Sequence, residues 1–374
     1  MLLVSISLHA GAQDLAARHA LIGKAYEAER YAEVARLIEA QLEQAQGTTW
    51  QDSLHQYLYK YGRAMGKTKG ADAGIAAAES VLARMGSTYK AADRMDALFD
   101  LSWIYYEAGR YKQCVRVDSL ATVVAKRPGV PRAMGGRAHQ YLAFDYSIIG
   151  DHRSSLAQAK AALREYAKAD SVAVAQWAES YTAAGVANWH LGFVHEAEEW
   201  YNKALETLGD GTTEPILNRK ASTYGNLGVL WQQSGDLARS KANYHASLRM
   251  FDQLLAATKD PFTRDEATVN RSRTYLNLAT VYFAIGDEGR ARELLELAWK
   301  DRSSVLHPDD PQLLSVRDRM ADLELEAGAL KKAEVLERAY LTACEQRYGK
   351  QSEEYVRAAA KLADILAQQG NRTS

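Results

Sequence analysis

A series of glycines that recurs at nearly constant spacing constrains the fold more than any other feature of the sequence. The intervals are 41, 42, 43, 51, 42 and 42 residues between Gly109, Gly150, Gly192, Gly235, Gly286, Gly328 and Gly370. Aspartate follows directly at Asp151, Asp236 and Asp287. Glycine ends helices because it accepts a positive φ, and aspartate caps the first turn of the next helix. The spacing therefore predicts an array of helix hairpins.

Apolar and small residues recur at helical spacing on both sides of each glycine. The segment from Ala221 to Phe251 shows this best, with one stripe of Tyr224, Leu227, Gly228 and Trp231 and a second of Ser240, Tyr244, Ser247 and Leu248. The small Gly228 lets another helix approach closely. A hairpin with an apolar face on each arm buries both faces only against neighbours like itself, so the sequence predicts an all-α solenoid. Leu227, Tyr244 and Tyr282 are predicted core residues.

The composition fits a folded, soluble, helical protein. The chain is 47% hydrophobic and 25% charged, and it has only six prolines. A net charge of −1 gives no electrostatic footprint for nucleic acid or an anionic membrane, and no later apolar run is long enough to span a membrane. The two cysteines, Cys114 and Cys344, provide neither a disulfide framework nor a zinc-binding spacing.

The first residues resemble the end of a secretory signal. Leu2 to Leu8 is a short apolar run, and Ala10-Gly11-Ala12 fits a small-x-small cleavage pattern that would leave Gln13 at the mature N-terminus. A basic region before the apolar run is missing, so a second interpretation is a frayed strip of the first helix. We expect a signal remnant over residues 1–12, hence export to the periplasm or the exterior, with a cytoplasmic location as the alternative.

The whole set of positions resembles the tetratricopeptide repeat (TPR). Tyr224, Leu227, Gly228 and Trp231, followed by Gly235, Ser240, Tyr244 and Ser247, match its first helix, turn and second helix best. The usual TPR period is about 34 residues, so this period is about eight residues longer. The longer unit resembles kinesin-light-chain arrays, and the segments 307–311 and 348–355 support that comparison. The resemblance implies one solenoid over residues 13–374, with about eight helix pairs and the last pair incomplete.

The ends and one interval of the array depart from the regular pattern. In the first repeat, Glu29 stands where a turn glycine is expected, and in the next either Gly66 or Gly70 fits the turn. The 51-residue interval contains extra residues between Gln253 and Arg273, which form either a loop or longer helices. The last predicted helix begins at Glu353 and ends at Gly370.

No residue pattern points to catalysis, a cofactor or a metal. His195-Glu196 lacks a second histidine at the metalloprotease spacing, and the Gly192 turn separates His190 from His195. No nucleophile elbow, phosphate-binding loop or dinucleotide fingerprint occurs. We therefore expect no enzymatic activity and no cofactor.

By the TPR resemblance, the first helices line a concave groove. Aromatic side chains supply area and Arg or Asn supply hydrogen bonds in peptide-binding grooves. The expected partner-binding residues are Phe99, Trp103, Tyr106, Tyr141, Phe144, Trp189, Asn226, Arg273 and Asn277, and Arg137, His190 and Gln232 belong to the same set of positions. Aromatic residues at helical spacing belong more often to a helical core, and asparagine before Leu-Gly is common in TPR units for structural reasons.

Three functions remain open from the sequence. The leading hypothesis is a scaffold that binds a protein or peptide segment in this groove. The second, from the resemblance to long-period bacterial arrays, is the N-terminal regulatory half of a larger protein with a caspase-like CHAT protease or a signalling kinase domain. The third is an enzyme with an unrecognised site.

Overall fold

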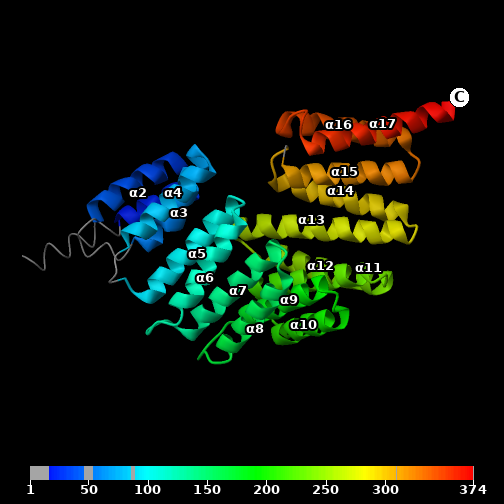
Figure 1. Cartoon of the computed structure of the whole chain (residues 1–374). Helices are drawn as coiled ribbons and strands as arrows, with labels where there is room; N and C mark the ends of the chain where they lie inside the picture. The colour runs from blue at the N-terminus through cyan, green and yellow to red at the C-terminus, as the bar shows by residue number, and fades with distance from the viewer. Residues whose placement is uncertain (1–16, 46–53, 86–88, 309, 374) are drawn as a thin grey trace, which may run out of the picture. The chain divides into compact units, whose positions relative to one another are not determined.

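The computed structural model describes residues 17–45, 54–85, 89–308 and 310–373, and every regular element in these ranges is a helix (Figure 1). The chain divides at the Gly192 turn into two compact units, Met1–Gly192 (unit 1) and Phe193–Ser374 (unit 2). The predicted signal segment over residues 1–12 lies outside the described residues and stays a prediction.

Unit 1 is a series of antiparallel helix hairpins. After helical residues 17–27 it contains α2 (Tyr31–Ala45), α3 (His55–Lys69), α4 (Ala71–Arg84), α5 (Ala91–Glu107), α6 (Tyr111–Val124), α7 (Arg132–Ile148), α8 (His152–Tyr166) and α9 (Val174–His190). Within hairpins α3 packs against α4, α5 against α6 and α7 against α8. The first helices also pack on one another, α3 against α5 and α7 against α9.

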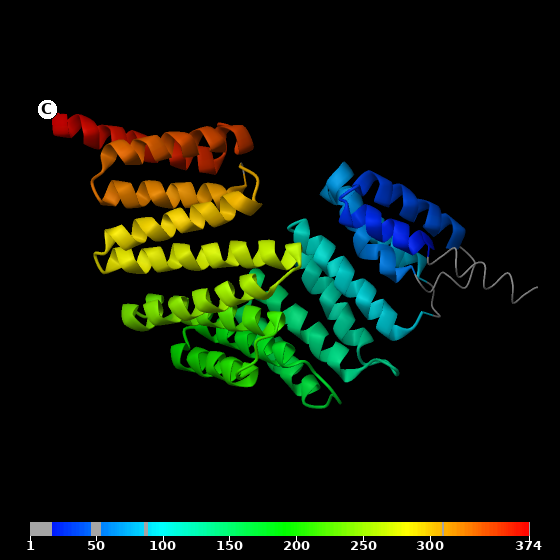
Figure 2. The same ribbon diagram turned by 180° about the vertical axis from the view of Figure 1, so that it is seen from behind.

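Unit 2 repeats the same architecture with longer helices, which Figure 2 shows from behind as successive layers. It contains α10 (Val194–Leu208), α11 (Glu214–Gln233), α12 (Leu237–Ala257), α13 (Pro261–Ala284), α14 (Glu288–Val305), α15 (Pro311–Glu326), α16 (Leu330–Tyr348) and α17 (Glu353–Thr373). From α10 to α16, each helix packs against the next one along the chain. The two units thus have the predicted all-α, stacked-hairpin fold.

The turn glycines adopt the backbone conformation that the spacing predicts. Those from Gly109 to Gly328 have φ between 69° and 87°, and Asp151, Asp236 and Asp287 each accept a hydrogen bond from the first turn of the next helix. In the second hairpin the turn is Gly70, with φ 96°, and Gly66 lies inside α3. Glu29 has a φ of 54°, the only positive value at a non-glycine among the described residues, so it replaces a turn glycine as predicted.

The structure shows how the last helix ends and what the extra residues of the 51-residue interval form. The prediction that the last helix ends at Gly370 is wrong, because α17 continues through Gly370 to Thr373. Glycine inside a helix costs only about 1 kcal/mol, which packing against α16 can offset. The extra residues of the 51-residue interval lengthen α12 to 21 and α13 to 24 residues instead of forming a loop.

Close packing of a first helix on its own second helix holds each hairpin together. In the α11/α12 hairpin the Tyr244 side chain is fully buried and its ring lies against Gly228, where a Cβ would come within 2.4 Å of the ring. Leu227 is also buried, so both residues are in the predicted core. The prediction that Tyr282 is a buried core residue is wrong in part, because Tyr282 is only half-buried and its hydroxyl lies 3.1 Å from Nε2 of His245.

Candidate functional site

The first helices of unit 1 present one continuous row of side chains each. Residues three or four apart along a helix share a face. The rows are joined because α3 packs against α5 and α5 against α7. The rows are His55, Tyr59, Arg63 and Lys67 on α3; Asp96, Asp100, Trp103 and Glu107 on α5; and Arg137, Tyr141, Phe144 and Ile148 on α7. We call this surface the first-helix face of unit 1.

An exposed aromatic cluster occupies the C-terminal half of this face. Tyr106 lies at its centre, with ring centroids 5.2 Å from Trp103, 5.6 Å from Phe144 and 5.7 Å from Tyr111. Trp103 and Phe144 are each 47% exposed, although aromatic rings of this size are usually well covered in a helical core. Four rings from three helices thus form an apolar surface that is partly exposed, most of all at Trp103 and Phe144.

Phe99 and Tyr141 support this cluster from the neighbouring turn. Phe99 is only 5% exposed, because the Tyr141 ring packs edge-on against it at 5.0 Å. The Arg137 guanidinium lies over both rings and donates a 2.9 Å hydrogen bond to the Tyr141 hydroxyl. Of these two predicted site residues, Phe99 therefore serves mainly as packing and Tyr141 remains partly open to solvent.

Two aspartates lie N-terminal to Trp103 on the same face of α5. Burial, and then the negative charge of Asp96, raise the pKa of Asp100 to about 7, although the positive charge of Arg137 and a hydrogen bond from the Tyr59 backbone oppose them. Burial also raises the pKa of Asp96, which Arg137 and His55 oppose. An acidic end thus adjoins the aromatic cluster, with Asp100 partly protonated near neutral pH.

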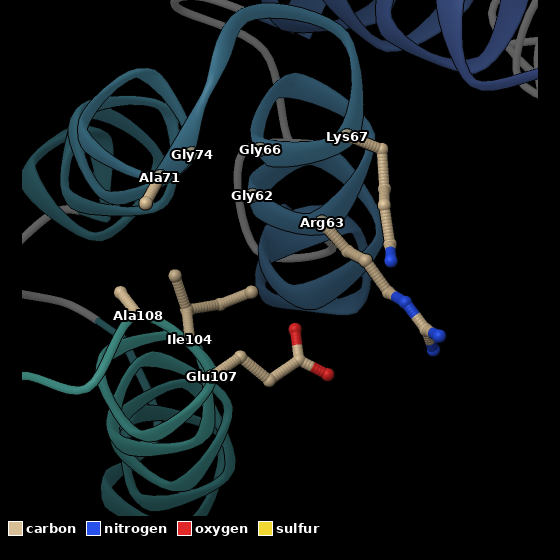
Figure 3. A pocket seen from close by; sticks show the side chains of 9 residues that line it. All are labelled: Gly62, Arg63, Gly66, Lys67, Ala71, Gly74, Ile104, Glu107 and Ala108. Atoms are coloured by element: carbon tan, nitrogen blue, oxygen red, sulfur yellow. The ribbon is translucent and has the colours of Figure 1, made fainter. Parts of the chain in front are cut away.

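A pocket of about 370 Å³ lies beside the aromatic cluster, between α3, α4 and the end of α5 (Figure 3). Its floor is backbone and small side chains, because α3 and α4 approach so closely that a Cβ on Gly74 would lie 2.6 Å from the Gly62 carbonyl oxygen. In Figure 3, Glu107 reaches from α5 toward α3, on the side where Arg63 and Lys67 lie. The pocket therefore has a small-residue floor and a charged rim.

Hydrogen bonds connect the rim of the pocket to the aromatic cluster. The Glu107 carboxylate accepts from Trp103 Nε1 at 3.2 Å and from the Tyr59 hydroxyl at 3.3 Å. Arg63 in turn donates to the hydroxyls of Tyr59 and Tyr26, at 3.1 and 3.2 Å. These bonds hold the Trp103 ring in one orientation, although almost half of its surface is exposed.

Trp189, the remaining predicted aromatic residue, belongs to a second ring group in unit 1. Its indole lies 4.3 Å from the His190 ring, which stacks on His152 at 4.2 Å with only 7° between the planes. Burial, and then the neighbouring His152, lower the pKa of His190. A stacked histidine pair therefore favours the uncharged state of His190.

Unit 2 holds the predicted hydrogen-bonding residues on its own first helices. Asn226 on α11 and Asn277 on α13 each stand nine residues before a turn glycine, and the two helices are in contact. Both amides are half-buried, whereas the Arg273 side chain is exposed. The equivalent positions place two amides one repeat apart on neighbouring helices.

Sequence reasoning missed several residues of the first-helix face and one residue of the aromatic cluster. The residues of the face are His55, Tyr59, Arg63, Lys67, Asp96, Asp100, Glu107 and Ile148, and the residue of the cluster is Tyr111. The sequence could have placed Asp96, Asp100 and Glu107 on this face, because they continue the helical spacing that selected Trp103. Arg63 and Tyr111 come from other repeats or from a second helix, so only the packing reveals them.

Metal ligands, membrane-spanning helices and reactive thiols were the other features sought among the described residues. Among the described residues there is no group of three or more histidine, cysteine, aspartate or glutamate side chains placed to hold a metal ion. None of the described helices is long and apolar enough to cross a membrane. Both cysteines are buried, and burial raises the pKa of the Cys114 thiol to about 12, so Cys114 is a poor nucleophile.

Comparisons with known proteins identify the repeat and the fold. A family model of the tetratricopeptide repeat matches residues 272–312, and no curated protein matches the sequence. One similar solved structure is the apo quorum sensor NprR from B. thuringiensis, with 15% identity, a TM-score of 0.53, and coverage of 95% of this chain and 99% of that one. A Rap protein complexed with competence and sporulation factor has 14% identity, a TM-score of 0.53, and coverage of 96% of this chain and 99% of that one. A signal transduction ATPase with a tetratricopeptide repeat sensor from Pyrococcus horikoshii has 14% identity, a TM-score of 0.56, and coverage of 91% of this chain and 50% of that one.

Proposed function

We propose that this chain, which has a tetratricopeptide-repeat match over residues 272–312 and the fold of tetratricopeptide-repeat proteins, is a non-enzymatic scaffold that binds a segment of a partner protein on the first-helix face of unit 1. Trp103, Tyr106 and Phe144 provide the main contact area. The Asn226, Arg273 and Asn277 side chains of unit 2 provide a second, hydrogen-bonding surface on that unit.

The observation that carries this proposal is the exposure of the aromatic cluster. Large aromatic side chains contribute much of the binding energy of protein interfaces, because each buries a large rigid area at little cost in conformational entropy. Trp103 and Phe144 are half-exposed, yet Tyr106 and the Glu107 hydrogen bond hold them in place. A preorganised apolar surface of this kind loses little entropy on binding.

The polar residues of unit 2 suit the backbone of a bound segment. An asparagine side chain can donate to a peptide carbonyl and accept from a peptide N–H at the same time. Asn226 and Asn277 stand at equivalent positions in successive repeats, so they offer the same pair of bonds twice. Arg273, which is exposed, adds a site for a carboxylate. Two of the similar structures are described as a quorum sensor and as a Rap protein complexed with competence and sporulation factor.

Selection of short random peptides on the immobilised full chain, followed by titration of the best binders, tests the proposal. Trp103→Ala or Phe144→Ala should weaken binding by about 2 kcal/mol, roughly 30-fold, because each removes a central contact. Leu120→Ala is the matched control, since Leu120 is 44% exposed but lies on the second helix α6. Asn277→Ala tests unit 2 separately.

The outcome is clear only for variants that stay folded. Each variant is first compared with the parent by far-UV circular dichroism and by thermal unfolding. If helical Trp103→Ala and Phe144→Ala proteins bind every selected peptide as tightly as the parent, the first-helix face is not the binding site and the proposal fails.

A further inference from the structure

We infer that the first-helix face of unit 1 selects a partner segment carrying a lysine or arginine beside a large apolar side chain. The cation meets Asp96 and Asp100, and the apolar side chain packs on the aromatic cluster. This inference rests on the proposed function and specifies the chemistry of the partner.

The two carboxyl groups are available to a ligand. Asp96 and Asp100 lie one helical turn apart, and within the described ranges neither forms an ion pair with a basic side chain, although the Tyr59 backbone gives Asp100 one hydrogen bond. The nearest cation on the neighbouring first helix, Arg137, is already held by the Tyr141 hydroxyl and by two aromatic rings. Asp100 is therefore a partly buried carboxyl group without a close counter-ion.

Burial of this carboxyl group is costly in the free protein. The raised pKa of Asp100 records that cost, because desolvation and the charge of Asp96 both disfavour the ionised form. A cationic side chain placed between the two groups would compensate both effects. A bound anionic side chain would add a third negative charge to the same place, so acidic segments are disfavoured.

The adjoining aromatic cluster explains why the cation should belong to a segment with an apolar residue. The methylene stem of lysine or arginine covers apolar surface while its charged end reaches a carboxylate, and a guanidinium also stacks on aromatic rings. The groups for both kinds of contact lie along one face of α5, with the carboxyl groups first and Trp103 after them. A small inorganic cation would use only half of this surface.

The spacing along α5 sets the spacing in the ligand. From the middle of the aspartate pair to Trp103 is about five residues, or roughly 7 Å at 1.5 Å per residue. Side chains on one side of an extended segment repeat every second residue, also roughly 7 Å apart. The expected motif is therefore a basic residue two positions from an aromatic or large aliphatic residue.

The experiment compares peptide selection on the parent chain and on the double variant Asp96→Asn/Asp100→Asn. We expect the motif to be enriched on the parent and absent on the variant. The best binder is then synthesised twice, with arginine and with citrulline, which has a similar shape but no charge. The parent should prefer the arginine peptide by about tenfold or more, as is usual for a hydrogen-bonded charge pair, and the double variant should show no preference.

A matched variant controls for net charge. Glu43→Gln/Glu296→Gln removes two exposed carboxylates from the second helices α2 and α14, and it should keep the full preference for arginine. The double variant should still bind the citrulline peptide through Trp103, which shows that its face is intact.

The pH dependence provides a further readout. Lowering the pH from 8 to 6 protonates Asp100, so affinity for the arginine peptide should fall by up to about tenfold, while affinity for the citrulline peptide should not change. The charged groups that face Asp100 are Asp96 on α5 and Arg137 on α7, and those near Asp96 are also Asp93 on α5 and His55 on α3. The double variant retains His55 and Arg137, so a pH effect that persists in it does not come from the aspartates.

Two outcomes separate the inference from the proposed function. If peptides bind through Trp103 but the parent shows no preference for arginine over citrulline, the inference is wrong and the proposed function stands. If no selected peptide depends on Trp103 or Phe144, the proposed function is wrong, and the inference fails with it.

Discussion

A buried pair of carboxyl groups between α6 and α7 makes the stability of unit 1 depend on pH. Asp118 and Asp145 are 2% and 4% exposed. The Ser102 hydroxyl donates to Oδ2 of Asp118 at 2.8 Å. Oδ1 of Asp118 and Oδ2 of Asp145 are buried, and no donor on any other described residue lies within hydrogen-bond distance of either oxygen. Burial, and then the charge of Asp145, raise the pKa of Asp118, and burial raises the pKa of Asp145. The folded pair therefore retains a proton at neutral pH.

The sign of the pH effect follows from this retained proton. In the unfolded chain both aspartates lose their protons near pH 4. Above that pH the folded state binds more protons than the unfolded state, so the free energy of unfolding falls as the pH rises through the raised pKa. One extra bound proton corresponds to a slope of about 1.4 kcal/mol per pH unit.

Replacing Asp118 by asparagine removes the need for this proton. The asparagine oxygen can still accept from Ser102, and its N–H₂ group can donate to Asp145 where the carboxyl proton did. The Asp118→Asn variant should therefore become increasingly more stable than the parent between pH 5 and 8, by at most about 1.4 kcal/mol per pH unit. Near pH 4 the two proteins should differ by less than about 1 kcal/mol.

Urea unfolding at several pH values measures this difference. Because repeat arrays unfold in parts, amide hydrogen exchange in α6 and α7 gives the local free energy alongside the global one. Asp72→Asn is the control, since the Asp72 side chain is 86% exposed in its ion pair with Arg110 and should not change the slope. Parallel pH profiles for the parent and Asp118→Asn, or a less stable variant at pH 8, would refute the reasoning.

Three further substitutions test the packing, each by urea unfolding against the parent. Gly228→Ala should cost about 1–3 kcal/mol, because its Cβ would lie 2.4 Å from the buried Tyr244 ring, and an unchanged midpoint would contradict this close approach. Glu29→Gly should add about 0.5 kcal/mol, because glycine adopts the φ of 54° without strain, so a loss of stability would count against a strained turn. Lys361→Met should cost about 3 kcal/mol by leaving the fully buried Glu337 without its cation, and Glu337→Gln in the same chain should recover part of that loss.

Local features of the fold could be predicted from the sequence because local interactions determine them. A turn that needs a positive φ selects glycine at Gly235, and the next residue, Asp236, caps the following helix through a bond to an N–H three residues away. Even Glu29 was placed correctly, because the period fixed where a turn must fall. The same period misplaced one helix end at Gly370, since glycine also occurs inside a packed helix.

The candidate site could be predicted only in part. Helical spacing selected Trp103 and Phe144, and the structure brings their rings together through Tyr106. Spacing alone could not separate Phe99 from Trp103, which lie one turn apart on α5. Phe99 is buried because Tyr141 and Arg137 on α7 cover it, whereas no described residue covers Trp103 to the same extent.

The sequence by itself thus determined where most of the turns fall and which residues could share a face, because those properties depend on neighbours within a few positions. The tertiary structure alone decided which side chains of that face are exposed to solvent and what the pKa values of its carboxyl groups are. The surroundings of Asp100 include Arg137, and those of Trp103 include Tyr59 through their shared partner Glu107. These partners lie about one repeat away in the chain, so their effects on burial and pKa exist only once the helices are packed.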